Sequence, residues 1–500
     1  MRKTAAVLVD SHLHLPDYFW DYEVTHRILD DLTIPNQEKI IAKRMKRWGW
    51  EKLPDDFLLA DNKSDHLILP RGYALRLKTR CTHYGIKIQW VDRRLGVYGS
   101  KFRWKHEFMP RDHQPEAVRK IRRYQQGMYE APTGSGKSLT CISFIHDVSP
   151  GKTIVLTDQI GLVNQWNKEV GHWLGEENVS VVGGGKWDDS KRIVVATLQT
   201  IWSGLKQGEI HDDWFSEFDA VIVDECHHVP ANTIREIVSK FPAFWRFGVS
   251  ATTDRKNGKF EFALAVLGEV FHIDDEATLR RAGVLVKPIV QVVETGYTFD
   301  YWPDHEAEQD DEGYWRCQKP GCKIKKAHFH RNNYQKLRAD LVKSQRRNIT
   351  LSHVLYHQIK LGKHIHLIVS DEIRQLDFIQ SSINSLIGKG NIPVYRLTGE
   401  VTGKKRRELI ERISNSPEAI VLATVAKEGL DIPRVDRIYL PFPSSSAAGT
   451  KQKVGRGTRV ADGKKNTIIF DFVDDVLVLR KQFRKRRYGF YDKSGMQVIM

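Results

Sequence analysis

A glycine-rich loop, APTGSGKS at residues 131–138, constrains the fold of this chain more than any other segment. It stands between a short apolar run and a helical pattern, and its glycines let backbone N–H groups turn toward phosphate oxygens at the start of that helix. Lys137 would then reach the β and γ phosphates of ATP, and the Ser138 hydroxyl would bind Mg²⁺. A chance glycine-rich turn is the alternative. The residues expected around the phosphates are Thr133, Gly134, Ser135, Gly136, Lys137 and Ser138.

Apolar runs rich in Val and Ile alternate with amphipathic helical patterns in two stretches of the chain, residues 106–293 and 336–475. Such runs are typical of parallel strands that are covered on both faces. We therefore expect two α/β domains in tandem, each built on a parallel sheet. The expected strands are 153–157, 192–197, 220–225 and 247–252 in the first stretch, and 364–369, 393–398, 419–424, 437–441 and 467–472 in the second.

The remaining segments have a different character. Residues 1–105 carry short alternating strand patterns around Leu67 and Ile88 with a helix between them, which predicts a small α+β domain. Residues 294–335 form an insert that is first acidic and then rich in Cys and His. Residues 476–500 form a strongly basic tail, whose cationic helix face either contacts phosphates or is simply solvated.

Paired carboxylates follow one of the expected strands of the first domain, at Asp224 and Glu225. An apolar strand that ends in two acids places them at the edge of the sheet that carries the phosphate loop. Asp224 can bind Mg²⁺ directly or through water, and Glu225 can orient and deprotonate an attacking water. A solvated acidic strand end is the alternative, which the upstream loop and the intervening α/β alternation disfavour.

A basic motif, QKVGRGTR at residues 452–459, lies in the second domain. Arg456 and Arg459 are three residues apart near a helix start, so both can stabilise charge on a transferred phosphoryl group, and Gln452 belongs to the same motif. A basic surface turn is the alternative. The order of the loop, the carboxylates and the arginines favours nucleotide hydrolysis.

The charge of the chain fits a polyanionic partner. The net charge is +16 and the pI about 9.4, and Lys and Arg that neutralise phosphates release counterions. No stretch approaches the roughly 18 apolar residues of a membrane-spanning helix, and the amino-terminal run is too short for a secretory signal. The five cysteines are too scattered for a disulfide framework, which indicates a reducing compartment, so we expect a cytoplasmic protein.

These motifs together resemble those of superfamily 2 helicases over residues 108 to 475. The resemblance assigns motif I to residues 131–138, motif II to 224–227, motif III to 250–252 and motif VI to 452–459. It also places Gln114 where the family has an adenine-reading glutamine, and it implies that Gly429 and Asp431 of motif V contribute to the nucleotide site. The fold that it implies is two RecA-like domains that close on ATP and reopen after hydrolysis.

Within the superfamily, the block SATTDRKNGK at residues 250–259 is similar to that of the XPB, type III restriction and phage UvsW-like group. The amino-terminal segment and the run VVGGGKWDD at residues 181–189 also resemble the UvsW type, whose small leading domain binds DNA. Motif II reads DECH rather than DEAD, and a typical XPB-type Arg-Glu-Asp element is missing. The group implies a motor that moves along a phosphate backbone.

Two sets of residues are candidates for nucleic-acid contacts. The resemblance implies that Thr197, Gln199 and Thr424 line the track of the strand. A second patch interleaves Arg44, Lys46 and Arg47 with two tryptophans, which suits phosphate binding and base stacking. A solvated helix face followed by two core tryptophans explains this patch nearly as well.

A Cys/His cluster lies in the insert. Two thiolates and two imidazoles suit tetrahedral Zn²⁺, although the C-x4-C and H-x-H spacings are not those of the commonest zinc fingers. A basic loop with incidental Cys and His residues is the other interpretation. The four residues are Cys317, Cys322, His328 and His330.

Taken together, the sequence predicts an ATP-dependent DNA helicase or translocase. Its expected substrate is forked or branched DNA in recombination, repair or replication, and a monomer without a membrane partner is plausible. An RNA helicase, a motor subunit of a restriction-type complex, and a nucleic-acid-binding scaffold with a vestigial nucleotide site are the alternatives. Intact Lys137, Asp224, Glu225, Arg456 and Arg459 disfavour the scaffold.

Overall fold

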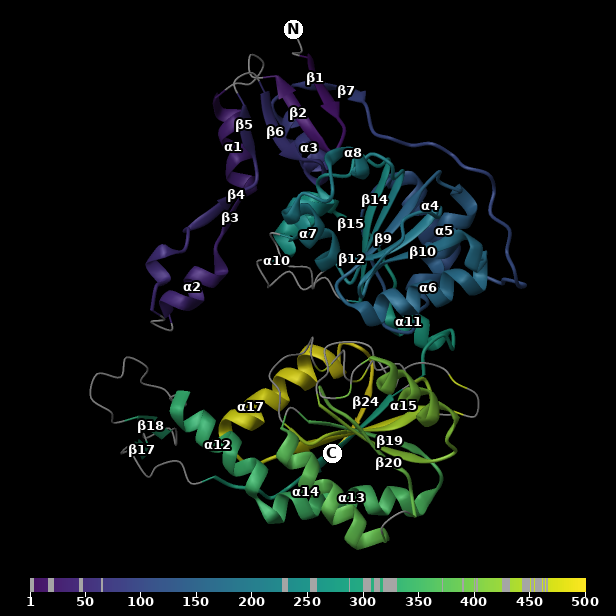
Figure 1. Cartoon of the computed structure of the whole chain (residues 1–500). Helices are drawn as coiled ribbons and strands as arrows, with labels where there is room; N and C mark the ends of the chain where they lie inside the picture. Colours follow the sequence, from purple (N-terminus) through teal and green to yellow (C-terminus); the bar gives the residue numbers. More distant parts are fainter. Residues whose placement is uncertain are drawn as a thin grey trace. The chain divides into compact units, whose positions relative to one another are not determined.

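The computed structural model of the chain divides into two compact units, Met1–Asp275 and Glu276–Met500 (Figure 1). No helix among the described residues combines the length and apolar character that a membrane crossing needs. The structure describes residues 4–16, 22–44, 48–63, 66–226, 233–251, 259–286, 288–299, 307–309, 315–317, 331–370, 372–388, 391–399, 401, 403–424, 432–442, 450, 454, 461, 464 and 466–500.

The first unit is built on an eight-stranded sheet in the order β11-β10-β12-β9-β13-β14-β8-β15, in which only β11 is antiparallel to its neighbour. Helices α4, α5 and α6 cover one face and α7, α8 and α10 the other, so the central strands β9, β12 and β13 are buried along their whole length (Figure 1). The strands are β8 (Gln126–Glu130), β9 (Thr153–Thr157), β10 (Val179–Gly183), β11 (Lys186–Trp187), β12 (Ile193–Thr197), β13 (Ala220–Asp224), β14 (Trp245–Ser250) and β15 (Val270–Ile273). The helices are α4 (Gln114–Tyr124), α5 (Lys137–Val148), α6 (Ile160–Leu174), α7 (Leu198–Gln207), α8 (Asp212–Phe215) and α10 (Lys259–Leu267).

The amino-terminal region of this unit forms a second, five-stranded sheet in the order β5-β6-β2-β1-β7. Buried and exposed residues alternate along β1 and β2, as expected of strands with one covered face. A two-stranded ribbon, β3 with β4, carries α2 between its strands. The elements are β1 (Thr4–Val9), β2 (His12–Pro16), α1 (Tyr22–Leu32), β3 (Thr33–Pro35), α2 (Gln37–Arg44), β4 (Asp56–Leu58), β5 (Asp61–Lys63), β6 (His66–Pro70), α3 (Ala74–His83) and β7 (Lys87–Asp92).

Two buried arginines tie this small sheet to the larger one. The Arg71 Nε donates to Gln126 Oε1 at 2.9 Å, at the start of β8. The Arg246 Nη1, from β14, donates to the Ser11 carbonyl at 3.0 Å. Both guanidinium groups are fully buried, and the two regions share one apolar core. The amino-terminal sheet is therefore packed onto the strands that carry the phosphate loop and motif III.

The second unit holds a seven-stranded, wholly parallel sheet in the order β20-β21-β19-β22-β23-β16-β24. Helices α13 and α14 contribute to the core on one face, and α15 and α17 to the core on the other (Figure 1). The strands are β16 (Pro288–Glu294), β19 (Ile365–Ser370), β20 (Val394–Leu397), β21 (Ala419–Thr424), β22 (Val435–Leu440), β23 (Thr467–Val473) and β24 (Gln497–Ile499). The other elements are α11 (Glu276–Arg281), β17 (Ala307–Gln309), β18 (Trp315–Cys317), α12 (Arg331–Lys343), α13 (Gln345–Leu361), α14 (Ile373–Ile387), α15 (Gly403–Asn415) and α17 (Leu477–Arg486).

Two segments lie in a different place from the one that the sequence suggested. Residues 288–293 were expected in the first α/β domain, but β16 pairs with β23 of the second sheet along its whole length. Residues 476–500 were expected to form a basic tail, but α17 and β24 belong to the second unit. The physical reason is that Phe483, Phe490 and Tyr491 are buried in the apolar core, and Arg486 is buried in an ion pair with Asp471 of β23.

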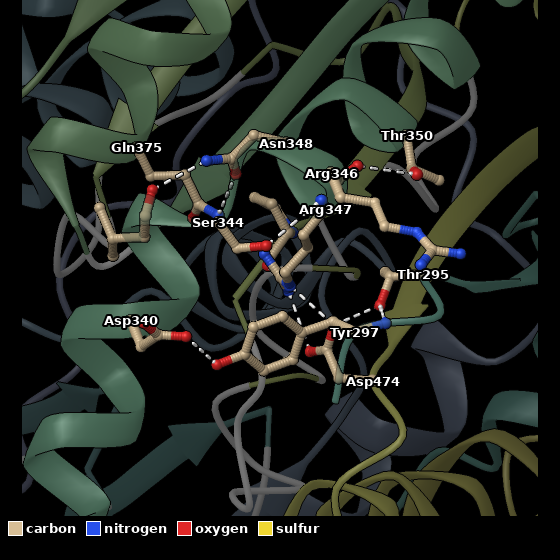
Figure 2. A network of polar contacts seen from close by, with 12 residues as sticks. Thr295, Tyr297, Asp340, Ser344, Arg346, Arg347, Asn348, Thr350, Gln375 and Asp474 are labelled. Carbon is tan, nitrogen blue, oxygen red and sulfur yellow. Dashed lines mark hydrogen bonds and ion pairs between the residues drawn. The ribbon is translucent and has the colours of Figure 1, made fainter. Parts of the chain in front are cut away.

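A polar network joins the ends of several strands of the second unit (Figure 2). The Asp474 carboxylate, after β23, accepts from Arg347 Nε at 2.7 Å and from Thr295 Oγ1 at 2.6 Å. Beyond Thr295, the Tyr297 hydroxyl donates to Asp340 Oδ2 on α12 at 2.5 Å. Arg347 and Asp474 are both fully buried, so one ion pair holds helix α13 to the segment that follows β23.

A buried histidine makes the second unit sensitive to mild acid. His366 lies in β19 with its Nδ1 3.0 Å from the Tyr439 hydroxyl, and burial lowers its pKa from 6.5 to about 3. The unfolded chain therefore binds a proton below pH 6.5 that the folded chain rejects, so stability falls as the pH drops from 6.5 toward 3. We expect this residue to remove about 2 kcal/mol of the free energy of unfolding at pH 5. Denaturant unfolding at pH 7.5 and pH 5 should show a smaller difference in the His366→Gln variant; an equal difference would contradict the assignment.

Candidate active site

The first sheet brings the sequence-predicted motifs to one edge. Strands β13, β14 and β8 are consecutive neighbours and parallel, so their carboxyl ends lie side by side. The phosphate loop follows β8, Asp224 ends β13 with Glu225 directly after it, and Ala251 of the expected motif III follows β14. The crossover connections between these parallel strands therefore bring three segments that are distant in the sequence to one edge of the sheet.

The loop owes its path to two glycines in the left-handed region. Gly134 has φ 87° and Gly136 φ 94°, which side chains with a Cβ rarely adopt. A Cβ on Gly136 would also lie 2.8 Å from the Gln114 Nε2. That amide instead donates to the Gly136 carbonyl at 3.2 Å, while its Oε1 accepts from the Arg111 backbone N–H at 2.9 Å. Gln114 is fully buried, so in this structure it holds the loop.

Two further residues that the sequence did not single out support the loop from the same side. The Arg111 Nη1 donates to the Gly134 and Ser135 carbonyls, both at 3.1 Å, and the His113 Nε2 lies 3.1 Å from the Ser135 carbonyl. Because the N–H of a trans peptide points away from its C=O, anchoring the Ser135 carbonyl turns the Gly136 N–H to the opposite side. In the sequence, the one indication of this role was that Arg111 and His113 lie just before Gln114.

Lys137 begins α5 and points along the loop. Its Nζ donates to the Ala131 carbonyl at 3.2 Å and lies 3.8 Å from Glu225 Oε1. These partners satisfy an ammonium that is only 11% exposed. Ser138, the next residue on the helix, is partly exposed. A phosphate could replace the contacts of the Lys137 ammonium with Ala131 and Glu225 without a large movement of the lysine side chain.

The two carboxylates occupy different environments. Asp224 is buried, and the Trp166 Nε1 donates to its Oδ2 at 2.8 Å. Burial, followed by repulsion from Glu225, raises the pKa of Asp224 to about 7. Glu225 adopts φ 44°, uncommon for a residue with a side chain, and its Oε2 accepts from the Ala251 N–H at 3.3 Å. Trp166 was not among the residues that the sequence predicted for the site.

This set of atoms fits Mg²⁺ and a phosphate chain. Asp224 and Ser138 offer oxygen ligands, which Mg²⁺ prefers, and a bound cation would offset the burial of the Asp224 charge. The buried Ser135 Oγ has no hydrogen-bond partner within the part of the chain that the structure describes, so the loop retains an unused polar group. Thr133 and Gly134, before it, are half-buried.

The residues expected along a nucleic-acid track lie in varied settings. Thr197 is buried at the end of β12, where its Oγ1 caps α7 by accepting from the Thr200 N–H at 3.2 Å. Gln199 is exposed on the first turn of α7. Thr424 ends β21 in the second unit and is half-buried, and Arg44 ends α2 and is exposed. Thr197 thus has a structural task as well as its predicted one.

Most of the remaining predicted site residues lie outside the part of the chain that the structure describes. Cys317 is the exception, and its backbone belongs to β18. The residues that lie outside the described part of the chain are Lys46, Arg47, Cys322, His328, His330, Gly429, Asp431, Gln452, Arg456 and Arg459.

Two family models match the two α/β regions. Residues 107–255 match the type III restriction enzyme res subunit, and residues 346–461 match the helicase conserved C-terminal domain. The chain belongs to the superfamily 2 helicases. Its helicase domains imply the use of ATP and Mg²⁺, which the residues at the carboxyl edge of the first sheet can bind. Two parallel α/β sheets are the fold that the sequence predicted for this superfamily.

Individual proteins that are similar to this chain also include helicases. The helicase is 24% identical over 473 residues to putative helicase 22 of a Sulfolobus islandicus filamentous virus, covering 89% of this chain and 77% of that protein. It is 21% identical over 454 residues to the ATP-dependent DNA helicase uvsW of phage T4, covering 84% and 82%. A fragment of a putative HsdR subunit of a type I restriction enzyme from Vibrio vulnificus has a similar fold, with a TM-score of 0.53, 18% identity and coverage of 79% and 68%.

Proposed function

We propose that this helicase is an ATP-dependent DNA helicase or translocase that unwinds or branch-migrates forked or branched DNA. The observation that carries the ATPase part is the meeting of Lys137, Asp224 and Glu225 at the carboxyl edge of the first sheet. The choice of DNA rests on the similarity to the DNA helicase of phage T4 over most of both chains. The basic character of the chain, with a net charge of +16, is consistent with it.

The proposed reaction uses the side chains as the structure places them. Lys137 exchanges its contacts with Ala131 and Glu225 for phosphate oxygens, and the loop N–H groups bind the remaining charge. Glu225, released from Lys137 but still held by the Ala251 N–H, accepts a proton from the attacking water. Asp224 and Ser138 would hold Mg²⁺, which would neutralise part of the phosphate charge when bound.

The contact between Glu225 and Ala251 offers a route from hydrolysis to the rest of the first unit. Ala251 follows β14, and the Arg246 side chain of that strand is bound to the amino-terminal sheet. We propose that this sheet binds DNA, as in the UvsW-like group that it resembles. Gln452, Arg456 and Arg459 are proposed to stabilise the transferred phosphoryl group, and Thr197, Gln199 and Thr424 to contact the strand.

ATPase and unwinding assays test this function together. We expect DNA to stimulate hydrolysis at least about tenfold more than RNA, and forks and four-way junctions to be opened faster than plain duplexes. DNA affinity should fall steeply with salt, because each contacted phosphate contributes about 0.7 to 0.9 to the slope of log affinity against log salt. Stronger stimulation by RNA would favour an RNA helicase, and a flat salt response would contradict a phosphate track.

A further inference from the structure

A basic and aromatic hollow lies on the first unit, at the edge of the sheet opposite to the phosphate loop. It encloses about 450 Å³. Helices α4 and α5 end at this edge and β14 begins there, whereas the loop follows the far end of β8, which is five residues or about 16 Å long. The hollow is therefore separate from the ATP site. The residues that the argument uses are Tyr98, Arg119, Arg122, Arg123, Phe244 and Trp245.

The cations of the hollow come from one face of α4. Arg119, Arg122 and Arg123 stand at positions i, i+3 and i+4, which lie together on a helix. The Arg119 Nη2 is 2.6 Å from Glu116 Oε2, so its charge is already paired. Across the described part of the chain, neither Arg122 nor Arg123 forms an ion pair. Asp147 also lines the hollow, with its Oδ1 2.9 Å from the His146 Nδ1.

Tyr98 presents an exposed ring on a fixed backbone. Its side chain is 68% exposed, although the residues on both sides of it are anchored. The Gly99 N–H donates to the Ser149 carbonyl at 2.8 Å, and the Gly151 N–H donates to the Val97 carbonyl at 2.7 Å. The Tyr98 ring also packs edge-on against Trp245, with centroids 5.5 Å apart. A large aromatic ring that is both exposed and positioned is a platform on which a base can stack.

We propose that this hollow binds one nucleotide unit of a nucleic-acid strand, with the base on Tyr98 and the phosphate at Arg122 and Arg123. That the ligand is a nucleic-acid strand rests on the proposed function. That it is a nucleotide rests on the residues of the hollow, because planar guanidinium groups bind phosphate and an aromatic ring stacks on a base. Thr197 and Gln199 lie at the carboxyl edge of the sheet, so the hollow holds a different stretch of the substrate from the strand that they are proposed to contact.

Photo-crosslinking locates this contact without requiring hydrolysis. The full chain carrying Lys137→Ala is irradiated with an oligonucleotide containing 5-iododeoxyuridine, and separately with 5-iododeoxyuridine monophosphate. We expect the oligonucleotide to crosslink to Tyr98 and the free nucleotide not to do so. A chain that fails to unwind DNA would refute the proposed function but would still give this crosslink. Crosslinking by the free nucleotide alone, or none at Tyr98, would overturn the proposal for a strand.

Affinity measurements separate this site from general attraction to a basic surface. The Arg122→Gln/Arg123→Gln variant should bind oligothymidylate about tenfold more weakly at low salt, and its salt slope should fall by about 0.7, the contribution of the one phosphate that the two arginines contact. Tyr98→Ala should weaken binding with little change in slope. The matched control, Lys101→Gln/Arg103→Gln, removes the same charge from exposed residues outside the hollow. Equal losses in the two double variants, at equal thermal unfolding midpoints, would refute the proposal.

Discussion

Replacing Glu225 with Gln is expected to lower ATP turnover about a thousandfold while leaving ATP binding near that of the unchanged protein. A general base contributes roughly 10²–10⁴ to a rate, and Gln cannot accept the proton. Binding should persist because Gln has nearly the same shape, and because removing the carboxylate 3.8 Å from Lys137 frees that cation for phosphate. Single-turnover hydrolysis and equilibrium binding of ATP measure the two quantities separately.

The controls for this prediction come from the same site and the same unit. Lys137→Ala should lose ATP affinity, which Glu225→Gln should not, because the ammonium contacts the phosphates in the bound state. Glu217→Gln makes the same chemical change at a half-exposed carboxylate paired with Lys152 and should hydrolyse ATP normally. Near-normal turnover by Glu225→Gln would remove the proposed base.

The sequence predicted β9, β12, β13 and β14 of the first sheet and the phosphate loop, because these depend on local signals. Residues 153–157 were expected as a strand and form β9, since five consecutive apolar or β-branched residues leave few alternatives. Gly134 and Gly136 were recognisable because the path of the loop needs left-handed residues. In each case the decisive interaction lies within a few residues of the motif.

The sequence did not predict what depends on distant partners. The sequence of β16 does not indicate that it pairs with β23, because an apolar strand of that length fits either sheet. The sequence predicted no role for Arg71 or Arg246, yet both are buried against backbone carbonyls that only the folded chain brings together. It predicted none for Trp166 either, because the hydrogen bond of Trp166 to Asp224 forms only when α6 packs beside β13.

Removing one partner of the Arg347–Asp474 pair is expected to destabilise the second unit by about 3–5 kcal/mol, because the remaining charge stays buried without compensation. The pair is fully buried, with Nε and Oδ1 2.7 Å apart (Figure 2). Arg347→Met leaves the Asp474 carboxylate with Thr295 as its remaining side-chain donor. Denaturant unfolding of the full chain, followed by hydrogen exchange in β16 and β23, measures the loss.

The double variant Arg347→Met/Asp474→Leu separates charge from packing. Replacing both members of a buried pair by apolar residues of similar volume is often neutral or stabilising, so this protein should be more stable than either single variant. The neighbouring pair of Arg480 with Asp475 has the same 2.7 Å separation but side chains that are 42% and 59% exposed. Arg480→Gln should therefore cost about 0–1 kcal/mol, since water screens that pair. If Arg347→Met and Arg480→Gln were equally mild, the buried pair could not be what holds α13 to the segment that follows β23.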